Sequence, residues 1–140
     1  MSGETDIEKL IKTMQPELSN EEYVFSTLTM DLSSILEMDP WAIIQENEGT
    51  TVIIDVEKAE KNHILSESIF KRITLKVHSS LNAVGLTAMV SVKLMELGIS
   101  ANVIAGYYHD HIFVQTEYAE KALIGLLELS KSSRGKINNS

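Results

Sequence analysis

The chain has 140 residues, a formal net charge of −8 and 44% hydrophobic residues, which suits one globular domain or two small ones that share a core. It contains no cysteine, so disulfides, thiolate metal sites and thiol nucleophiles are excluded. The N-terminus lacks the basic and apolar regions of a signal peptide, and no long charge-free run suits a bilayer helix. We therefore expect a cytoplasmic protein with no membrane contact.

The charge is unevenly distributed along the chain. Residues 1–68 carry 15 Asp and Glu against 4 Lys and Arg, whereas residues 69–140 carry 5 against 8. Nucleic-acid binding needs a basic surface that neutralises phosphates, and no basic stripe is present. We expect no nucleic-acid partner.

In the first half, hydrophobic spacing predicts a helix at Ile7–Met14 that ends near Pro16. The β-branched and aromatic run Tyr23–Thr29 predicts a strand. The remaining predicted elements of this half are a short helix within 31–39, two strands at 41–44 and 51–55, and a short helix at 57–63.

The second half begins with a strand at Ile73–Val77 and a polar loop at His78–Asn82. An apolar helix should follow from Val84 to Leu97, where Gly98 ends it. The remaining predicted elements are strands at 100–105 and 111–115, a helix at 118–129 and a polar tail.

The predicted helix at 84–97 has two apolar stripes at about 100° per residue. One contains Leu86, Val90, Leu94 and Leu97, and the other contains Val84, Ala88, Val92 and Met95. A helix of this kind is covered on two sides, and no strand follows Leu129 to close the edge of the second sheet. These features predict a homodimer, unless the first half of the chain covers both surfaces.

An internal repeat divides the chain. When the sequence is shifted by sixty residues, Thr51–Lys61 falls on His111–Lys121 and Ala42–Ile44 falls on Asn102–Ile104. The earlier strands match better at an offset of fifty, with Tyr23 over Ile73. The first copy is therefore shorter by about ten residues, which are missing from its first helix.

The repeat predicts an α+β fold of two tandem ferredoxin-like βαββα units, with antiparallel sheets and helices on one face. The expected organisation is an N-terminal helix and truncated unit at 1–66, a complete unit at 67–130 and a disordered tail at 131–140.

Two runs, His78–Ala88 and Ala105–His111, together with Glu22–Phe25 and Glu46–Gly49, resemble a bacterial family of small proteins with two ACT-like domains. The resemblance covers roughly residues 7–130. It implies a regulatory protein from a superfamily that commonly binds amino acids and regulates other proteins.

The loop that ends at Gly85 is the candidate ligand site. A helix N-terminus offers unpaired N–H groups to a carboxylate, and glycine permits close approach. The alternative is a capped turn with no ligand. The predicted ligand-binding residues, completed by the adjacent strand, are Ser79, Ser80, Leu81, Asn82, Ala83, Val84, Gly85, Asn102, Val103 and Ile104.

The sequence His109-Asp110-His111 has a spacing that is typical of metal sites, because residues 109 and 111 share a face of an extended strand and both could bind one metal ion. No third ligand can be placed beside them, so we expect a hairpin turn with Asp110 at a tight position and histidines packed on Tyr107 or Tyr108. No metal and no cofactor are expected.

Three function classes remain. The first is a sensor that binds an amino acid, and the second is a protein–protein interaction module without a ligand. The third is a small enzyme centred on His109 or His111. No nucleophile elbow, phosphate loop or defined carboxylate pair is present, so we expect no catalytic residues and no enzyme.

Overall fold

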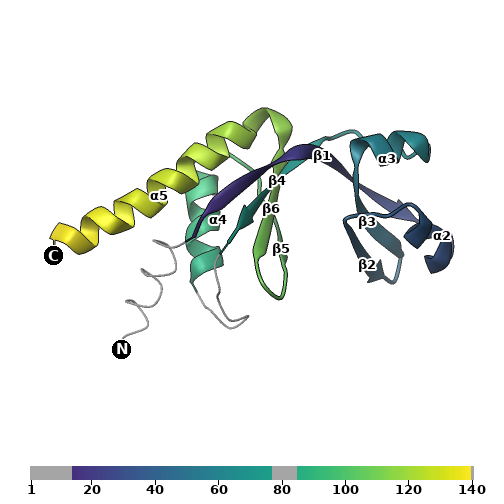
Figure 1. The fold of residues 1–140 in the computed structure, drawn as a ribbon, viewed down its shortest axis with the longest axis horizontal. Coiled ribbons are helices and arrows are strands. Elements are labelled where there is room, and N and C mark those ends of the chain that lie inside the picture. Colours follow the sequence, from purple (N-terminus) through teal and green to yellow (C-terminus); the bar gives the residue numbers. More distant parts are fainter. Residues whose placement is uncertain (1–13, 77–84, 140) are drawn as a thin grey trace.

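The computed structural model describes residues 14–76 and 85–139, with side chains as far as residue 131 (Figure 1). The elements are, in chain order, β1 (Pro16–Leu28), α2 (Leu32–Glu37), β2 (Ala42–Glu46), β3 (Gly49–Asp55), α3 (Val56–Lys61), β4 (Phe70–Leu75), α4 (Leu86–Glu96), β5 (Asn102–Ala105), β6 (Asp110–Gln115), the 3-10 turn η1 (Thr116–Tyr118) and α5 (Ala119–Asn139).

The strands of the described chain form one six-stranded sheet in the order β2-β3-β1-β4-β6-β5, with antiparallel neighbours throughout. β1 lies near the middle and is shared. Its C-terminal half pairs with β3, where Tyr23 lies opposite Asp55, and its N-terminal half pairs with β4, where Pro16 lies opposite Leu75. Each side of the sheet is a βαββα unit, so the predicted α+β fold of two ferredoxin-like units is confirmed.

The pairing registers show the repeat directly. In the first unit Ala42 of β2 lies opposite Ile53 of β3, and in the second unit Asn102 of β5 lies opposite Phe113 of β6. Both members of the pair are displaced by sixty residues. The first helix is shorter in the first unit, as expected, but α2 has 6 residues and α4 has 11, so the helices themselves differ by five residues and not by ten.

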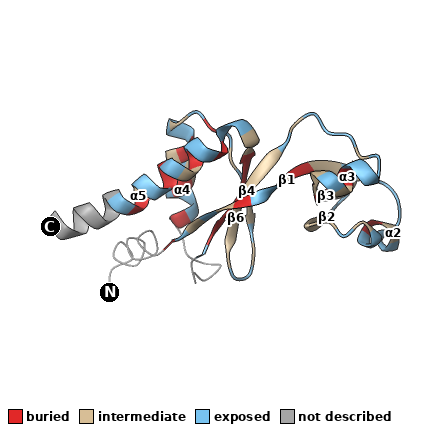
Figure 2. Ribbon diagram, turned by 45° about the horizontal axis from the view of Figure 1, so that its top comes forward, coloured by how far each residue is buried: buried red, intermediate tan, exposed pale blue. Residues whose placement is uncertain are grey.

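Two hydrophobic cores lie on the helix-covered face of the sheet, one in each unit. The larger core holds Leu86, Val90 and Leu94 of α4, which recur every four residues and are almost completely buried (Figure 2). In the smaller core Ile35 of α2 and Ala59 of α3 pack on the sheet. Each fully buried aliphatic side chain stabilises the fold by about 1.5–3 kcal/mol, so the second unit carries most of this stabilisation.

The edge of the second unit was expected to lack a closing strand, but β1 occupies that position within the same chain. The first strand was predicted to begin at Tyr23, whereas β1 begins at Pro16, a proline at the first strand position. Without that N-terminal extension, the sequence could not show that the edge was closed. An open edge of the second sheet therefore gives no reason to expect a second chain.

The two ends of the chain also depart from expectation. The last helix was predicted to end at Leu129, before a disordered tail, but α5 continues to Asn139. This extension is polar and lacks the apolar periodicity that was used to predict the helices. The predicted helix at 7–14 lies outside the described residues except for Met14, which is buried in the larger core.

Candidate functional site

Most of the predicted ligand loop, from Ser79 to Val84, lies outside the described residues. Gly85 is described and is the N-cap of α4, with φ of +105°. Its carbonyl accepts a hydrogen bond from the Met89 amide at 2.9 Å. A positive φ favours glycine, so the sequence places glycine where the chain turns into the helix.

The other predicted ligand residues lie on β5, the edge strand of the second unit. The Asn102 side-chain amide donates to the Phe113 carbonyl at 3.2 Å, which ties β5 to β6. Val103 packs against the larger core, and Ile104 packs on the opposite face of the sheet. Asn102 therefore has a structural partner within its own hairpin.

The predicted turn at His109–His111 differs from the structure in detail. The turn is Gly106 to His109, with the Gly106 amide donating to the His109 carbonyl at 2.9 Å, and Asp110 is the first residue of β6. His111 was expected on Tyr107 or Tyr108 but packs on Trp41 of the first unit. Among residues 14–76 and 85–139, no group of three His, Asp or Glu is arranged to hold a metal ion.

A second region of interest lies on the face of the sheet that carries no helices. Five rings pack edge to face there with centroids 5.1–6.3 Å apart, which is the favoured geometry for aromatic pairs. They form the aromatic layer, which consists of Tyr23, Phe25, Trp41, Phe70 and Phe113. The aromatic layer contains side chains from both units, which contact one another within it.

Arg72 of β4 lies at the border of the aromatic layer. Its Nη1 donates to the Tyr23 hydroxyl at 2.5 Å, and its Nε donates to Thr74 Oγ1 at 3.2 Å. The guanidinium carbon lies 5.2 Å from the Tyr23 ring centroid and 5.3 Å from that of Trp41, within cation–π range. One cation from the second unit is thus held by two rings from the first.

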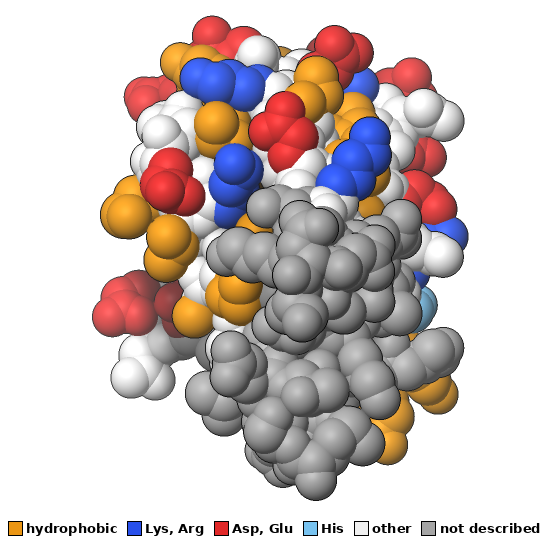
Figure 3. All heavy atoms as spheres, turned by 90° about the vertical axis from the view of Figure 1, so that its left-hand side faces the viewer, with side chains coloured by type: hydrophobic (Ala, Val, Ile, Leu, Met, Phe, Trp, Pro, Cys, Tyr) orange, Lys and Arg blue, Asp and Glu red, His pale blue; other side chains and the backbone are white. Residues whose placement is uncertain are grey.

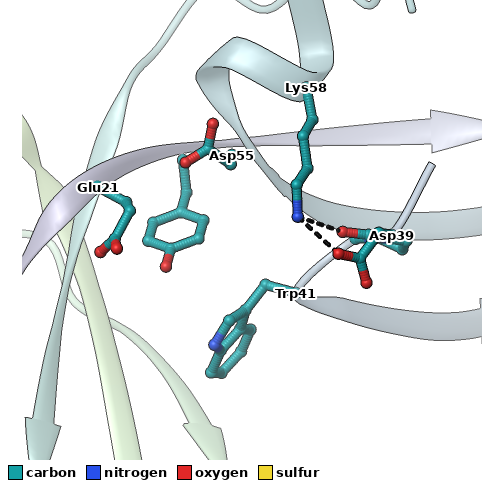
Figure 4. A pocket seen from close by; sticks show the side chains of 7 residues that line it. Glu21, Asp39, Trp41, Asp55 and Lys58 are labelled. Atoms are coloured by element: carbon teal, nitrogen blue, oxygen red, sulfur yellow. Dashed lines mark hydrogen bonds and ion pairs between the residues drawn. The ribbon is translucent and has the colours of Figure 1, made fainter.

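A cleft of about 450 Å³ opens beside this layer (Figure 4). Its walls come from β1, the loop between α2 and β2, the end of β3, and α3. The lining residues are Glu21, Tyr23, Asp39, Pro40, Trp41, Asp55 and Lys58.

One ion pair lies on the rim of the cleft. Lys58 Nζ donates to the Asp39 carboxylate at 2.8 Å and to the Asp39 carbonyl at 3.1 Å. The hydrogen bond from Lys58 lowers the pKa of Asp39, and the same contact raises the pKa of Lys58. Both groups stay charged at neutral pH, and the positive charge of Lys58 is already neutralised by Asp39.

The inner wall is less solvated. Burial raises the pKa of the Tyr23 hydroxyl, and the nearby Arg72 charge opposes that rise. Tyr23 stays protonated at neutral pH, accepts from Arg72 and keeps its own O–H for another acceptor. Asp55 caps α3, because its Oδ1 accepts from the Glu57 amide at 2.8 Å.

Sequence reasoning did not find this cleft. Its charged residues lie far apart in the chain, at positions 21, 39, 55 and 58, and none belongs to a motif. The only local signal was Asp39-Pro40-Trp41, an isolated tryptophan beside a turn. The residues converge because β1 pairs with β3, which sets Tyr23 opposite Asp55, and because the Trp41 amide donates to the Ile53 carbonyl of β3.

With the fold and these sites defined, the chain can be compared with known proteins. Two family models described as "ACT domain" match it, one at residues 2–71 and the other at 68–128. The chain belongs to the ACT-domain family. The two matches divide this ACT protein near the link between α3 and β4. No curated protein is similar to it in sequence.

Several solved structures resemble this ACT protein. A Vibrio cholerae protein of unknown function is 50% identical, with a TM-score of 0.84 over 92% of this chain and 99% of that one. The regulatory subunit of aspartate kinase from Thermus thermophilus is 11% identical, with a TM-score of 0.64 over 84% of this chain and 96% of that one.

Aspartate kinase from Clostridium acetobutylicum is 12% identical to the ACT protein, with a TM-score of 0.68 over 86% of this chain and 35% of that one. At these low identities the two kinase comparisons show a common fold. In the described part of the ACT protein, no helix is long and apolar enough to cross a membrane.

Proposed function

We propose that this ACT protein is a regulatory sensor that binds an amino acid at the turn between β4 and α4. ACT domains are regulatory modules, and two of the structural relatives are an aspartate kinase and a regulatory subunit of one. The observation that carries the proposal is Gly85, whose positive φ marks the entry to α4. The first-turn amides of a helix have no partner within the helix, and in this proposal they bind the carboxylate of the ligand.

The ligand would complete its contacts on β5. An amino acid has a carboxylate for the helix amides and an ammonium that needs carbonyl or carboxylate acceptors. The edge strand β5, from Asn102 to Ile104, has backbone groups that β6 does not use on its outer side. In this proposal Ser79, Ser80 and Asn82 add side-chain hydrogen bonds to the same ligand.

A thermal-shift screen against the twenty amino acids tests the proposal. Saturation at 100 times Kd stabilises a protein by about 2.7 kcal/mol, which raises the melting temperature by several degrees in a chain of this size. Asn82→Ala should reduce the rise caused by the active amino acid. Gln45→Ala is the matched control, since it removes an exposed amide from the first unit. An unchanged rise in Asn82→Ala would place the ligand elsewhere.

We also propose that the ACT protein forms a homodimer through α4. One predicted apolar stripe of this helix is buried in the larger core, while Val92 and Met95 of the other are 50% and 68% exposed. Hydrophobic side chains also lie among charged ones at the end of the molecule that carries α4 and α5 (Figure 3). Met95→Lys should convert a dimer to a monomer of 15.6 kDa in sedimentation, and a wild-type monomer at high micromolar concentration would contradict the proposal.

The alternative is an interaction module that has no small ligand. The exposed residues of α4 favour it, because the same surface could bind a different protein. The two functions differ in the screen: a sensor responds to at least one amino acid, and a ligand-free module responds to none.

A further inference from the structure

The cleft beside Trp41 has the dimensions of a binding site. Its volume of about 450 Å³ lies within the range of small-molecule pockets, about 300–1,000 Å³. It belongs to the first ACT unit, whereas the proposed amino-acid site belongs to the second. The two sites share no residue.

The aromatic wall of the cleft favours cations. Tyr23 and Trp41 both line it, and the same two rings already hold the Arg72 guanidinium, with its central carbon 5.2 Å and 5.3 Å from the ring centroids. The faces of such rings are electron-rich and attract ammonium and guanidinium groups. The contact with Arg72 therefore shows that these two rings already bind a positively charged group of the protein itself.

The carboxylates of the cleft also favour a positively charged ligand. Lys58 neutralises Asp39, which leaves Glu21 and Asp55 on the other side of the cleft (Figure 4). Within the described part of the chain, the Glu21 carboxylate accepts no hydrogen bond, and the Asp55 carboxylate accepts one, from the Glu57 amide. Both retain acceptor positions for a donor that enters the cleft.

The repeat shows that these residue types are not common to both units. A shift of sixty residues takes Asp39, Trp41, Asp55 and Lys58 to Ile99, Ala101, Gln115 and Tyr118. The second unit has the same strands and hairpin without a charged group at any of these positions. The charges and the indole are therefore particular to the first unit.

We infer that this cleft is a second ligand site, which takes a small organic cation with a primary ammonium group. The ammonium donates to Glu21 and Asp55, and the carbon chain lies against the rings of Tyr23 and Trp41. An anion is disfavoured, because the lining carries three carboxylates against one ammonium, and the Arg72 guanidinium beside the two rings still leaves a net negative charge. The inference does not depend on the amino-acid site, and the two can be tested separately.

Trp41 provides the assay, since it is the only tryptophan of the chain and lines the cleft. Its fluorescence is recorded during titration with 1,4-diaminobutane, with 1,4-butanediol of the same length, and with succinate. We expect a saturable change with the diamine that weakens as salt is added, and no saturable change with the diol or succinate. An equal response to diamine and diol, or no saturable response to the diamine, would overturn the inference.

Paired variants test the location. Glu21→Gln removes one carboxylate from the cleft, and the matched control Glu22→Gln removes the next carboxylate of β1, which does not line it. Because exposed charge pairs contribute modestly, we expect Glu21→Gln to weaken diamine binding about three- to fivefold and Glu22→Gln to leave it unchanged. Circular dichroism confirms that both variants are folded. Equal weakening in the two variants would show that general acidity attracts the diamine, and the site would be rejected.

Discussion

The indole of Trp41 lies edge-on to the imidazole of His111, with ring centroids 4.9 Å apart. Trp41 directly precedes β2 and His111 lies in β6, and three strands separate these two in the sheet. In a flat sheet, four strand spacings would put them about 19 Å apart. The sheet therefore bends into the arch seen in Figure 1, and this contact joins the first unit to the second across the concave side.

Removing the indole should weaken the contact between the units. Trp41 is partly buried against Tyr23, His111 and Phe113, so we expect Trp41→Ala to lower the free energy of unfolding by roughly 2 kcal/mol, less than a fully buried tryptophan would cost. Trp41→Phe keeps most of the ring contacts and should cost less than half of that. Urea denaturation measures both. A loss below about 0.5 kcal/mol in Trp41→Ala would mean that the contact contributes little.

Stability should depend on the protonation of His111. Burial lowers the pKa of His111, with further lowering from the positive charges of Arg72 and His109. The folded state thus prefers the neutral imidazole, whose Nδ1 lies 2.9 Å from Thr74 Oγ1. The unfolded chain binds the proton more readily, at about pH 6.5, so stability is full above that pH and falls as the pH drops below it.

The urea midpoint at several values between pH 8 and pH 5 measures this dependence. His111→Gln cannot titrate and should show a smaller fall across the same range. His63→Gln is the control, since it removes an exposed histidine from the first unit. If His111→Gln and the wild type lose stability in parallel, His111 is not the group responsible.

Ser19 should stabilise the irregular pairing of β1 with β4. The register shifts between Leu18 and Glu22, and the buried Ser19 hydroxyl accepts from the Arg72 amide at 3.0 Å and donates to the Glu21 carbonyl at 2.9 Å. Ser19→Ala leaves that amide without its acceptor, which should cost about 1–3 kcal/mol in unfolding free energy. Ser26→Ala, later in β1, is the control and should lie within about 0.5 kcal/mol of wild type. Equal effects in the two variants would rule out this role.

The crossing of α4 and α5 depends on Gly125. A Cβ at this position would lie 2.5 Å from Leu97 Cδ1. Alanine favours a helix by about 1 kcal/mol over glycine, but the end of the half-buried Leu97 side chain must move to admit the Cβ, so we expect Gly125→Ala to be close to neutral. In a Leu97→Ala background the clash is absent, and the same change should be stabilising. A double-mutant cycle in urea measures this coupling between Gly125 and Leu97, and simple additivity would contradict it.

The fold could be predicted because its signals are local and occur twice. The strands at Ala42–Ile44 and Asn102–Ile104 have matching patterns, and their observed registers repeat that match. The spacing of Leu86, Val90 and Leu94 predicted the buried face of α4 correctly. Gly85 was identified as the helix entry from sequence, and its positive φ agrees with that assignment.

The remaining features depend on pairings between distant parts of the chain. Nothing near Pro16 indicates that the strand there lies beside Leu75, and nothing near Trp41 indicates His111. For the same reason, nothing near Glu21 or Lys58 in the sequence indicates that both line one cleft. Sheet curvature results from the whole set of strands, so residues that meet only through it have no sequence signature.

The strand β1 belongs to both units, so we expect the protein to unfold as a single cooperative body. A fragment that starts at residue 67 would retain β4 but lose the neighbour that satisfies its outer backbone groups, from Phe70 to Leu75. Such a fragment would have an open edge that pairs with other chains. The two ACT units resemble interchangeable modules, but neither can be transplanted, deleted or unfolded without exposing the other.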